Sequence, residues 1–163
     1  MKTIEIARRD PRGQGERGEK LAAAWFIEQG AVVLFPALHT LRDYDFAVDW
    51  EDGSPPQRIQ VKTATFFRNE RWEVLVCTRG GNQSWSGIAK LLDSSKYEYL
   101  FVVVADGRRW LIPSREVGGV QAIRLGGPKY AEWELEPGQP LAIDRSALDS
   151  RAPWRGSRAV KGT

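Results

Sequence analysis

Alternation of apolar and polar residues marks two neighbouring segments of the chain as β-strands. In residues 44–50 and 57–64, side chains of the two kinds take turns. The apolar positions are Tyr44, Phe46, Val48 and Trp50 in the first segment and Ile59 and Val61 in the second. Because successive side chains of a strand point to opposite faces, each segment has one apolar and one polar face. We expect the two strands to pair as a hairpin, with the apolar faces turned to the core.

The remaining pattern predicts a chain of mixed α and β structure. Residues 16–29 have a broad apolar face and are followed by Gly30, a residue common just after a helix end, so they are predicted to be helical. Residues 99–105 are almost wholly apolar, which is typical of a central strand covered on both faces. Further strands are predicted at 31–35, 72–78, 109–112, 120–125 and 132–136, and short helical turns at 88–92 and 113–117.

Length and composition indicate one domain. The chain has 163 residues, of which 42% are hydrophobic, and this is enough to form a single core. We expect residues 15–140 to be that domain and residues 1–14 to be a loose N-terminus. Residues 141–163 are predicted to be a disordered basic tail, because the arginines and lysine from residue 151 onward have no acidic counterpart.

The rare residue types exclude several kinds of site. The single cysteine, Cys77, excludes an internal disulfide, and the single histidine, His39, excludes a site built from several histidines. No apolar stretch approaches the roughly 20 residues of a membrane-spanning helix, and the polar N-terminus has no signal-peptide core. We therefore expect a cytoplasmic protein. The net charge of +3 is compatible with nucleic acid as a partner without requiring it.

The polar face of the predicted hairpin gathers several chemically useful side chains. The register is set by placing Trp50 opposite Gln57. The facing pairs are then Asp45 with Lys62, Ala47 with Gln60, and Asp49 with Arg58. All six side chains share one face of the sheet. Taken alone, this face is most simply an exposed surface on which each aspartate forms an ordinary cross-strand ion pair.

A carboxylate on the preceding helix adds to this polar face. Glu19 shares a stripe of the helix with Ala22, Ala23 and Phe26, so its side chain can lean over the sheet. Glu16, one turn earlier, is the alternative acid. The order along the chain is therefore a helix with a glutamate, a strand with an aspartate, and a strand with a glutamine and a lysine two residues apart.

Three short motifs in this order resemble those of the PD-(D/E)XK nuclease superfamily. They are Gly18-Glu19, Tyr44-Asp45-Phe46 and Gln60-Val61-Lys62-Thr63. The chain is most similar to the branch of group I intron-associated homing endonucleases, in which glutamine replaces the acid of the third motif. The apolar strand at 99–104 and the later Trp110-Leu111-Ile112-Pro113 also resemble that branch. The resemblance covers residues 15–117 and implies an α/β fold with a restriction-endonuclease-like αβββαβ core, in which helices flank a central mixed sheet.

The resemblance also implies a function. The protein would be a metal-dependent DNA endonuclease, homing or restriction-like, that hydrolyses phosphodiester bonds. Asp45, Gln60 and Glu19 would be ligands of Mg²⁺, for which Mn²⁺ would substitute. Lys62 would orient or activate the attacking water and offset the charge that develops on the phosphate. These four residues form the predicted catalytic site.

The implied partner is double-stranded DNA. A double-strand cut needs two active sites, so a homodimer or higher homo-oligomer is expected. Candidate DNA contacts are Arg42, Arg68, Arg71, Arg79, Trp85 and Lys90.

Several alternatives remain open at this point. Asp43 and Asp49 could replace Asp45 as the essential acid. A structure-selective Holliday junction resolvase would share the same core. A catalytically weak nucleic-acid-binding module is the third possibility, because the neutral amide of Gln60 offers a cation less charge than a carboxylate would.

Overall fold

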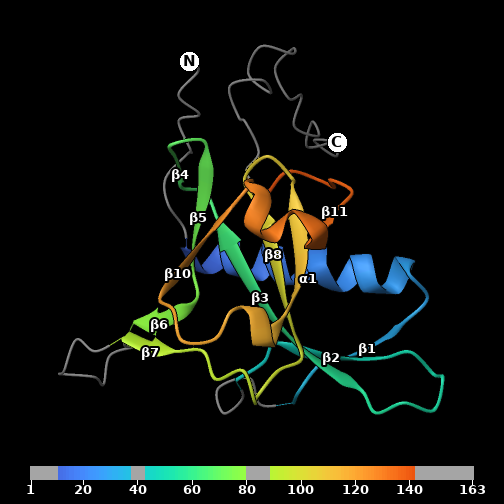
Figure 1. The fold of residues 1–163 in the computed structure, drawn as a ribbon. Coiled ribbons are helices and arrows are strands. Elements are labelled where there is room, and N and C mark those ends of the chain that lie inside the picture. Colours follow the sequence, from blue (N-terminus) through green and yellow to red (C-terminus); the bar gives the residue numbers. More distant parts are fainter. Residues whose placement is uncertain (1–10, 38–42, 80–88, 142–163) are drawn as a thin grey trace, which may run out of the picture.

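The computed structural model describes residues 11–37, 43–79 and 89–141 (Figure 1). In chain order, the elements are α1 (Pro11–Glu28), β1 (Val32–Leu34), β2 (Phe46–Asp49), β3 (Gln57–Ala64), β4 (Phe67–Arg68), β5 (Arg71–Leu75), β6 (Cys77–Arg79), β7 (Ala89–Leu91), β8 (Tyr99–Val104), β9 (Arg109–Pro113), the 3-10 helix η2 (Ser114–Glu116), β10 (Ala122–Leu125), the 3-10 helix η3 (Pro128–Trp133) and β11 (Glu134–Leu135). Within these ranges, α1 is the only α-helix.

Six strands form a central mixed sheet in the order β1-β2-β3-β8-β9-β11. The middle pair, β3 and β8, is parallel, and the other neighbours are antiparallel. Residues 100–104 of β8 are all buried, as predicted for a strand covered on both faces. The predicted α/β class with a central mixed sheet is therefore confirmed.

Helix α1 covers one face of this sheet. Its buried residues Ala22, Ala23 and Phe26 belong to one apolar cluster with Phe46 and Val48 of β2. The predicted apolar stripe of the helix and the predicted apolar face of the hairpin thus meet in the core. In Figure 1, the helix runs behind the central strands and crosses them.

The opposite face is covered mainly by strands. A second, three-stranded sheet has the order β10-β5-β4, and a third, two-stranded sheet pairs β6 with β7. Buried residues of β5 and β10, including Trp72 and Leu125, pack with Leu100 and Trp110 of the central sheet. The resemblance predicted a central sheet flanked by helices. In the described ranges, β5, β10 and η3 take the place of a second α-helix (Figure 1).

Some local predictions are corrected. Residues 11–14, predicted to be loose, form the first turn of α1, whose initial Pro11 is compatible with that position because the first backbone N–H of a helix has no partner in the helix. Residues 89–91, placed in a predicted helical turn, form β7, since β6 provides an antiparallel partner. Residues 1–10 and 142–163 lie outside the described ranges, whereas Leu141 is described and buried. No helix in the described ranges is long and apolar enough to cross a membrane.

Candidate active site

Asp45 stands just before β2 and is held against β3. Its backbone N–H donates a hydrogen bond to the carbonyl oxygen of Ile59 at 2.8 Å. Its side-chain Oδ2 accepts one hydrogen bond from the backbone N–H of Val61 at 2.6 Å and another from Nε2 of Gln60 at 3.0 Å. A carboxylate and an amide are thereby fixed side by side, on a face of β3 that the sequence predicted to be polar.

The register of the hairpin differs by two residues from the predicted one. The observed pairs are Phe46 with Ile59, Ala47 with Arg58, and Val48 with Gln57, so Asp45 lies level with Gln60 rather than with Lys62. The turn starts early because Oδ1 of Asp49 accepts a hydrogen bond from the N–H of Glu51, whose φ is 55°. A shift of two residues keeps every side chain on its predicted face.

The predicted ion pair between Asp49 and Arg58 is wrong. Arg58 instead pairs with Glu98, with 2.5 Å between Nη2 and Oε1, and its backbone N–H also donates to Oε2 of the same carboxylate. Hydrogen bonding to Arg58 lowers the pKa of Glu98. Glu98 comes beside Arg58 because β8 runs parallel to β3 with Tyr99 opposite Ile59, a pairing that the local sequence does not reveal.

Lys62 lies two residues after Gln60 on the same face of β3 and is half-buried. Burial lowers the pKa of Lys62, while the nearby carboxylate of Asp45 acts in the opposite direction. The thiol of Cys77 also lies near Lys62. Among the described residues, Lys62 has no hydrogen-bonding or ion-pair partner. The proximity of Cys77, the first residue of β6, to Lys62 was not predicted. It depends on how the two-stranded sheet of β6 and β7 is placed relative to the central sheet.

The helical acid approaches from the other side of the central sheet. Glu19 is half-buried on α1 and follows Gly18, which lies so close to β3 that a Cβ there would be 2.2 Å from Cγ2 of Thr63. Thr63 faces the helix, and alternation therefore turns Lys62 to the opposite face. Glu16, the alternative acid, is exposed and pairs with Arg12 at 3.3 Å. The structure thus groups Asp45, Gln60 and Lys62 and places Glu19 on the helix behind them.

Four of the predicted DNA contacts lie in described segments. They are Arg68 on β4, Arg71 on β5, Arg79 on β6 and Lys90 on β7. Arg42 and Trp85 lie outside the described residues. The ammonium of Lys90 is 3.4 Å from the carboxylate of Asp43; the side chain of Lys90 is largely exposed and that of Asp43 is partly exposed. This pair joins β7 to the segment before β2, so Asp43 is engaged by a lysine of another strand.

The donor atoms of this site suit a hard cation. In the described part of the chain, no group of three or more histidine, cysteine, aspartate or glutamate side chains is placed to hold a metal ion. The carboxylate of Asp45 nevertheless lies beside Gln60, which donates to it from Nε2 and keeps its own amide oxygen as a further oxygen donor for a cation. Mg²⁺ is usually bound through only one or two carboxylates and completes its shell with waters and substrate phosphates. The residues present therefore fit Mg²⁺.

Comparison with known proteins supports the fold. No protein-family model matches the chain, and no curated protein matches it. Among solved structures, the chain is similar to a bacterial homing endonuclease, I-Ssp6803I, with a TM-score of 0.67 and 15% sequence identity. The match covers 77% of this chain and 89% of that one. At this identity the likeness concerns the fold, and it confirms the predicted restriction-endonuclease-like architecture.

Proposed function

We propose that this protein is a metal-dependent DNA endonuclease of the PD-(D/E)XK superfamily, homing or restriction-like. The observation that carries the proposal is the grouping of Asp45, Gln60 and Lys62 on one face of the central sheet. A carboxylate, an amide in contact with it and a half-buried ammonium form the set needed beside a phosphodiester. The similarity of the fold to that of a homing endonuclease supports the same conclusion.

Asp45 and Gln60 would hold Mg²⁺ or Mn²⁺. Glu19, which lies on the helix across the central sheet, stays a prediction as the third ligand. A bound cation would polarise the scissile phosphate and lower the pKa of a coordinated water. The contribution of the chain is to hold the ligands in place beforehand. The hydrogen bond from the backbone N–H of Val61 already orients the carboxylate of Asp45.

Lys62 would contact the scissile phosphate or the attacking water and offset the negative charge that develops during hydrolysis. Its half-buried position matters, because an ammonium that is already poorly hydrated loses little further solvation when a phosphate approaches. The substrate would be double-stranded DNA. Two copies of the chain would supply the two active sites that a double-strand cut requires.

Cleavage of a supercoiled plasmid in the presence of Mg²⁺ or Mn²⁺ tests the proposal. Lys62→Ala and Asp45→Ala should each reduce cleavage on the order of 10²-fold or more. Arg12→Ala is the matched control, because Arg12 is an exposed residue on α1. Equal activity in the wild type and in both active-site variants would contradict the catalytic assignment.

The same assay distinguishes this nuclease from the two alternatives, a junction resolvase and a nucleic-acid-binding module. A four-way junction offered beside a linear duplex would be cut preferentially by a junction resolvase. Binding of duplex DNA by the wild type without cleavage under either metal would instead identify a binding module with this fold.

A further inference from the structure

The second sheet carries two arginines on its outward face, of which Arg68 is exposed and Arg71 is half-buried. The tip of the β4–β5 hairpin is formed by residues 69–70, both with positive φ, 49° and 59°, as in the two-residue turns that fix hairpin register. Arg68 therefore lies directly opposite Arg71, and Phe67 opposite Trp72. Trp72 is buried and its ring centroid is 4.8 Å from that of Phe67. Since side chains alternate, Arg68 and Arg71 share the outward face.

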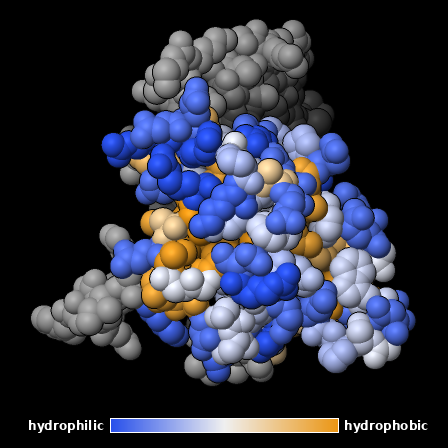
Figure 2. Space-filling model, in the orientation of Figure 1, coloured by the Kyte–Doolittle hydropathy of each residue, from blue (hydrophilic) through white to orange (hydrophobic). Residues whose placement is uncertain are grey.

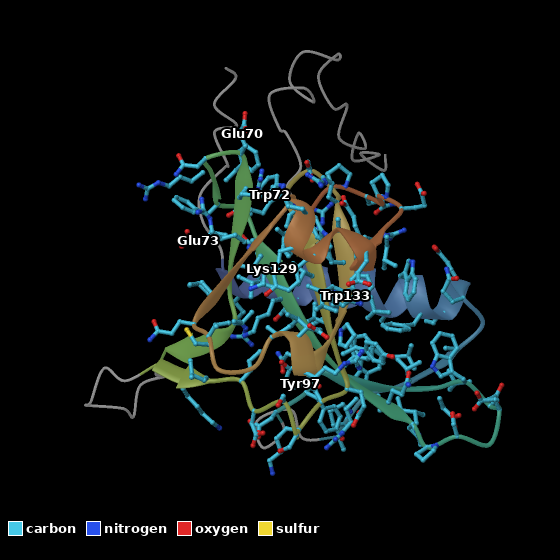
Figure 3. All side chains as sticks on the ribbon, in the orientation of Figure 1. Glu70, Trp72, Glu73, Tyr97, Lys129 and Trp133 are labelled. Carbon is cyan, nitrogen blue, oxygen red and sulfur yellow. The ribbon has the colours of Figure 1, made fainter. Side chains whose placement is uncertain are left out.

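Strand β10 adds a third arginine to this face. Arg124 lies opposite Glu73 of β5, while its neighbours Ile123 and Leu125 are buried in the core. Figure 3 shows Glu73 pointing away from the body of the protein and Trp72 pointing into it. Figure 2 shows a strongly hydrophilic surface over the β4–β5 hairpin. We call the outward side chains of Arg68, Arg71 and Arg124 the arginine face.

Backbone carbonyl oxygens, rather than carboxylates, accept hydrogen bonds from the guanidinium groups of Arg71 and Arg124. Arg71 donates from Nη1 to the carbonyl oxygen of Glu70 at 2.9 Å, and Arg124 donates from Nη2 to that of Arg68 at 3.5 Å. Arg71 also lies across Gly127, where a Cβ would come within 2.5 Å of its Nε. In the described ranges none of the three arginines forms an ion pair, although two glutamates lie on the same hairpin.

The two arginines that face each other at the tip of the hairpin are poorly suited to stability alone. Like charges directly opposite each other destabilise a sheet, and the pair formed by Arg68 and Arg71 is such a case. A bound polyanion would remove that cost. Guanidinium groups bind phosphate oxygens through charge-assisted and often bidentate hydrogen bonds. Guanidinium groups spread over an open sheet face can reach the phosphates of a duplex more easily than the base edges, which are recessed in a groove. Contacts to phosphates carry no sequence information.

The position of the face relative to the active site suits the same duplex. Arg71 lies at the start of β5, which packs against β3, and Cys77, which lies near Lys62, is six residues further along a nearly continuous extended segment. At about 3.3 Å per residue, this segment spans at most about 20 Å. That length corresponds to about six base pairs of duplex at 3.4 Å each.

We propose that the arginine face is a second DNA contact, which binds the sugar-phosphate backbone beside the cleaved position without reading sequence. The inference rests on the proposed DNA substrate and adds to it a surface and a residue, Arg124. The chain would then use different residues for catalysis and for DNA affinity. The group around Asp45 and Lys62 performs the chemistry, and the arginine face contributes affinity.

The test is the salt dependence of duplex binding by the full chain without divalent cations. Removing one arginine that binds a phosphate should reduce the slope of log K against log salt concentration by about 0.9. Arg124→Gln should show about that reduction, and the triple variant Arg68→Gln/Arg71→Gln/Arg124→Gln up to about 2.7. Duplexes of unrelated sequence should show the same reduction. Arg12→Gln, on the helix across the central sheet, should leave the slope unchanged.

The outcomes distinguish this inference from the proposed function. If the triple variant has the same slope and the same thermal unfolding temperature as the wild type, the arginine face does not bind DNA. The proposed nuclease function would be unaffected by that result. A reduction confined to one DNA sequence would also overturn it, because backbone contacts do not select bases. A wild type that neither binds nor cuts duplex DNA would overturn both. If Arg71→Gln unfolds the protein, the double variant Arg68→Gln/Arg124→Gln provides the same readout.

Discussion

The carboxylate of Asp45 accepts a hydrogen bond of 2.6 Å from the backbone N–H of Val61, sixteen positions further along the chain. The same oxygen, Oδ2, accepts the amide of Gln60 at 3.0 Å. One acid is thus anchored by a neighbouring strand and contacted by a neutral side chain at the position where the resembled superfamily usually has a second acid. The consequences of that neutrality can be measured.

Restoring the acid at this position should make stability depend on metal. In Gln60→Glu, a hydrogen bond to Asp45 is replaced by repulsion between two carboxylates, so the free energy of unfolding should fall by about 1–3 kcal/mol in the absence of divalent cations. If the proposed cation site is correct, Mg²⁺ held between the two acids would relieve their repulsion and recover much of this loss. Thermal unfolding with and without Mg²⁺ measures both effects.

Gln60→Ala is the control for that experiment, since it removes the hydrogen bond to Asp45 without adding charge. Mg²⁺ should stabilise Gln60→Glu by clearly more than it stabilises Gln60→Ala. Equal responses of the two variants would contradict a cation site at Asp45.

The close approach of α1 to β3 should be sensitive to a single methyl group. In Gly18→Ala, the new Cβ would lie 2.2 Å from Cγ2 of Thr63, so we expect the free energy of unfolding to fall by about 1–3 kcal/mol. Gly15→Ala is a matched control on the same helix. Nothing lies within 4 Å of that position, and alanine should stabilise it by up to about 1 kcal/mol through helix propensity.

A second variant makes the cause specific. Thr63→Ser removes the clashing methyl group while keeping the hydroxyl that accepts a hydrogen bond from Gln14. Gly18→Ala/Thr63→Ser should therefore regain most of the stability that Gly18→Ala loses in chemical denaturation. If the double variant is no more stable than Gly18→Ala, steric contact with Thr63 is not the reason for the glycine.

Local sequence patterns predicted the parts of the fold that depend on alternation. The strand at 57–64 was placed with the bounds that the structure has, and the polar face carrying Gln60 and Lys62 followed from its period of two. The register of the hairpin did not follow, because it depends on Glu51 adopting a left-handed conformation that its residue type does not favour.

Contacts between distant segments were beyond these patterns. Glu98 binds Arg58 only because β8 is parallel to β3, and local patterns cannot select that partner without the sheet order. The same applies to Cys77 near Lys62, which requires β5 and β6 to fold back over the central sheet. The sequence therefore predicted the site residues that lie on one hairpin. It did not predict the neighbours that other strands bring to them.

The half-buried charge of Lys62 should lower the free energy of unfolding at neutral pH. Burial lowers its pKa below the ordinary 10.5, so in the interval between the lowered value and 10.5 the unfolded chain holds the proton and the folded protein has released it. The free energy of unfolding therefore rises with pH across that interval. Below it, both states are charged and the folded state bears the full cost of burial. Lys62→Met should accordingly be more stable than the wild type at pH 7, on the order of 1 kcal/mol.

Urea denaturation at pH 7, 9 and 10.5 tests this expectation. The advantage of Lys62→Met over the wild type should shrink as the pH rises towards 10.5. Lys20→Met, on the exposed side of α1, should show no such trend. An advantage that stays constant with pH would mean that packing, rather than the buried charge, accounts for the effect.

The pair formed by Glu98 and Arg58 should stabilise the sheet with the opposite dependence on pH. Hydrogen bonds from Arg58 lower the pKa of Glu98 below its ordinary 4.5, so the contribution is complete above 4.5 and is lost as the pH falls through the lowered value. Both side chains are more than a third exposed, and solvent screening limits the effect of Glu98→Gln at pH 7 to about 1 kcal/mol.

Urea denaturation of Glu98→Gln and the wild type, at pH 7 and again well below pH 4, measures this contribution. The difference should be present at pH 7 and absent in acid, where the carboxyl group of the wild type is also neutral. Glu116→Gln is the matched control, because Glu116 pairs with the exposed Arg115 at 3.4 Å and should change stability by less than about 0.5 kcal/mol. A loss in Glu98→Gln that persists in acid would show that the side chain acts through packing and not through its charge.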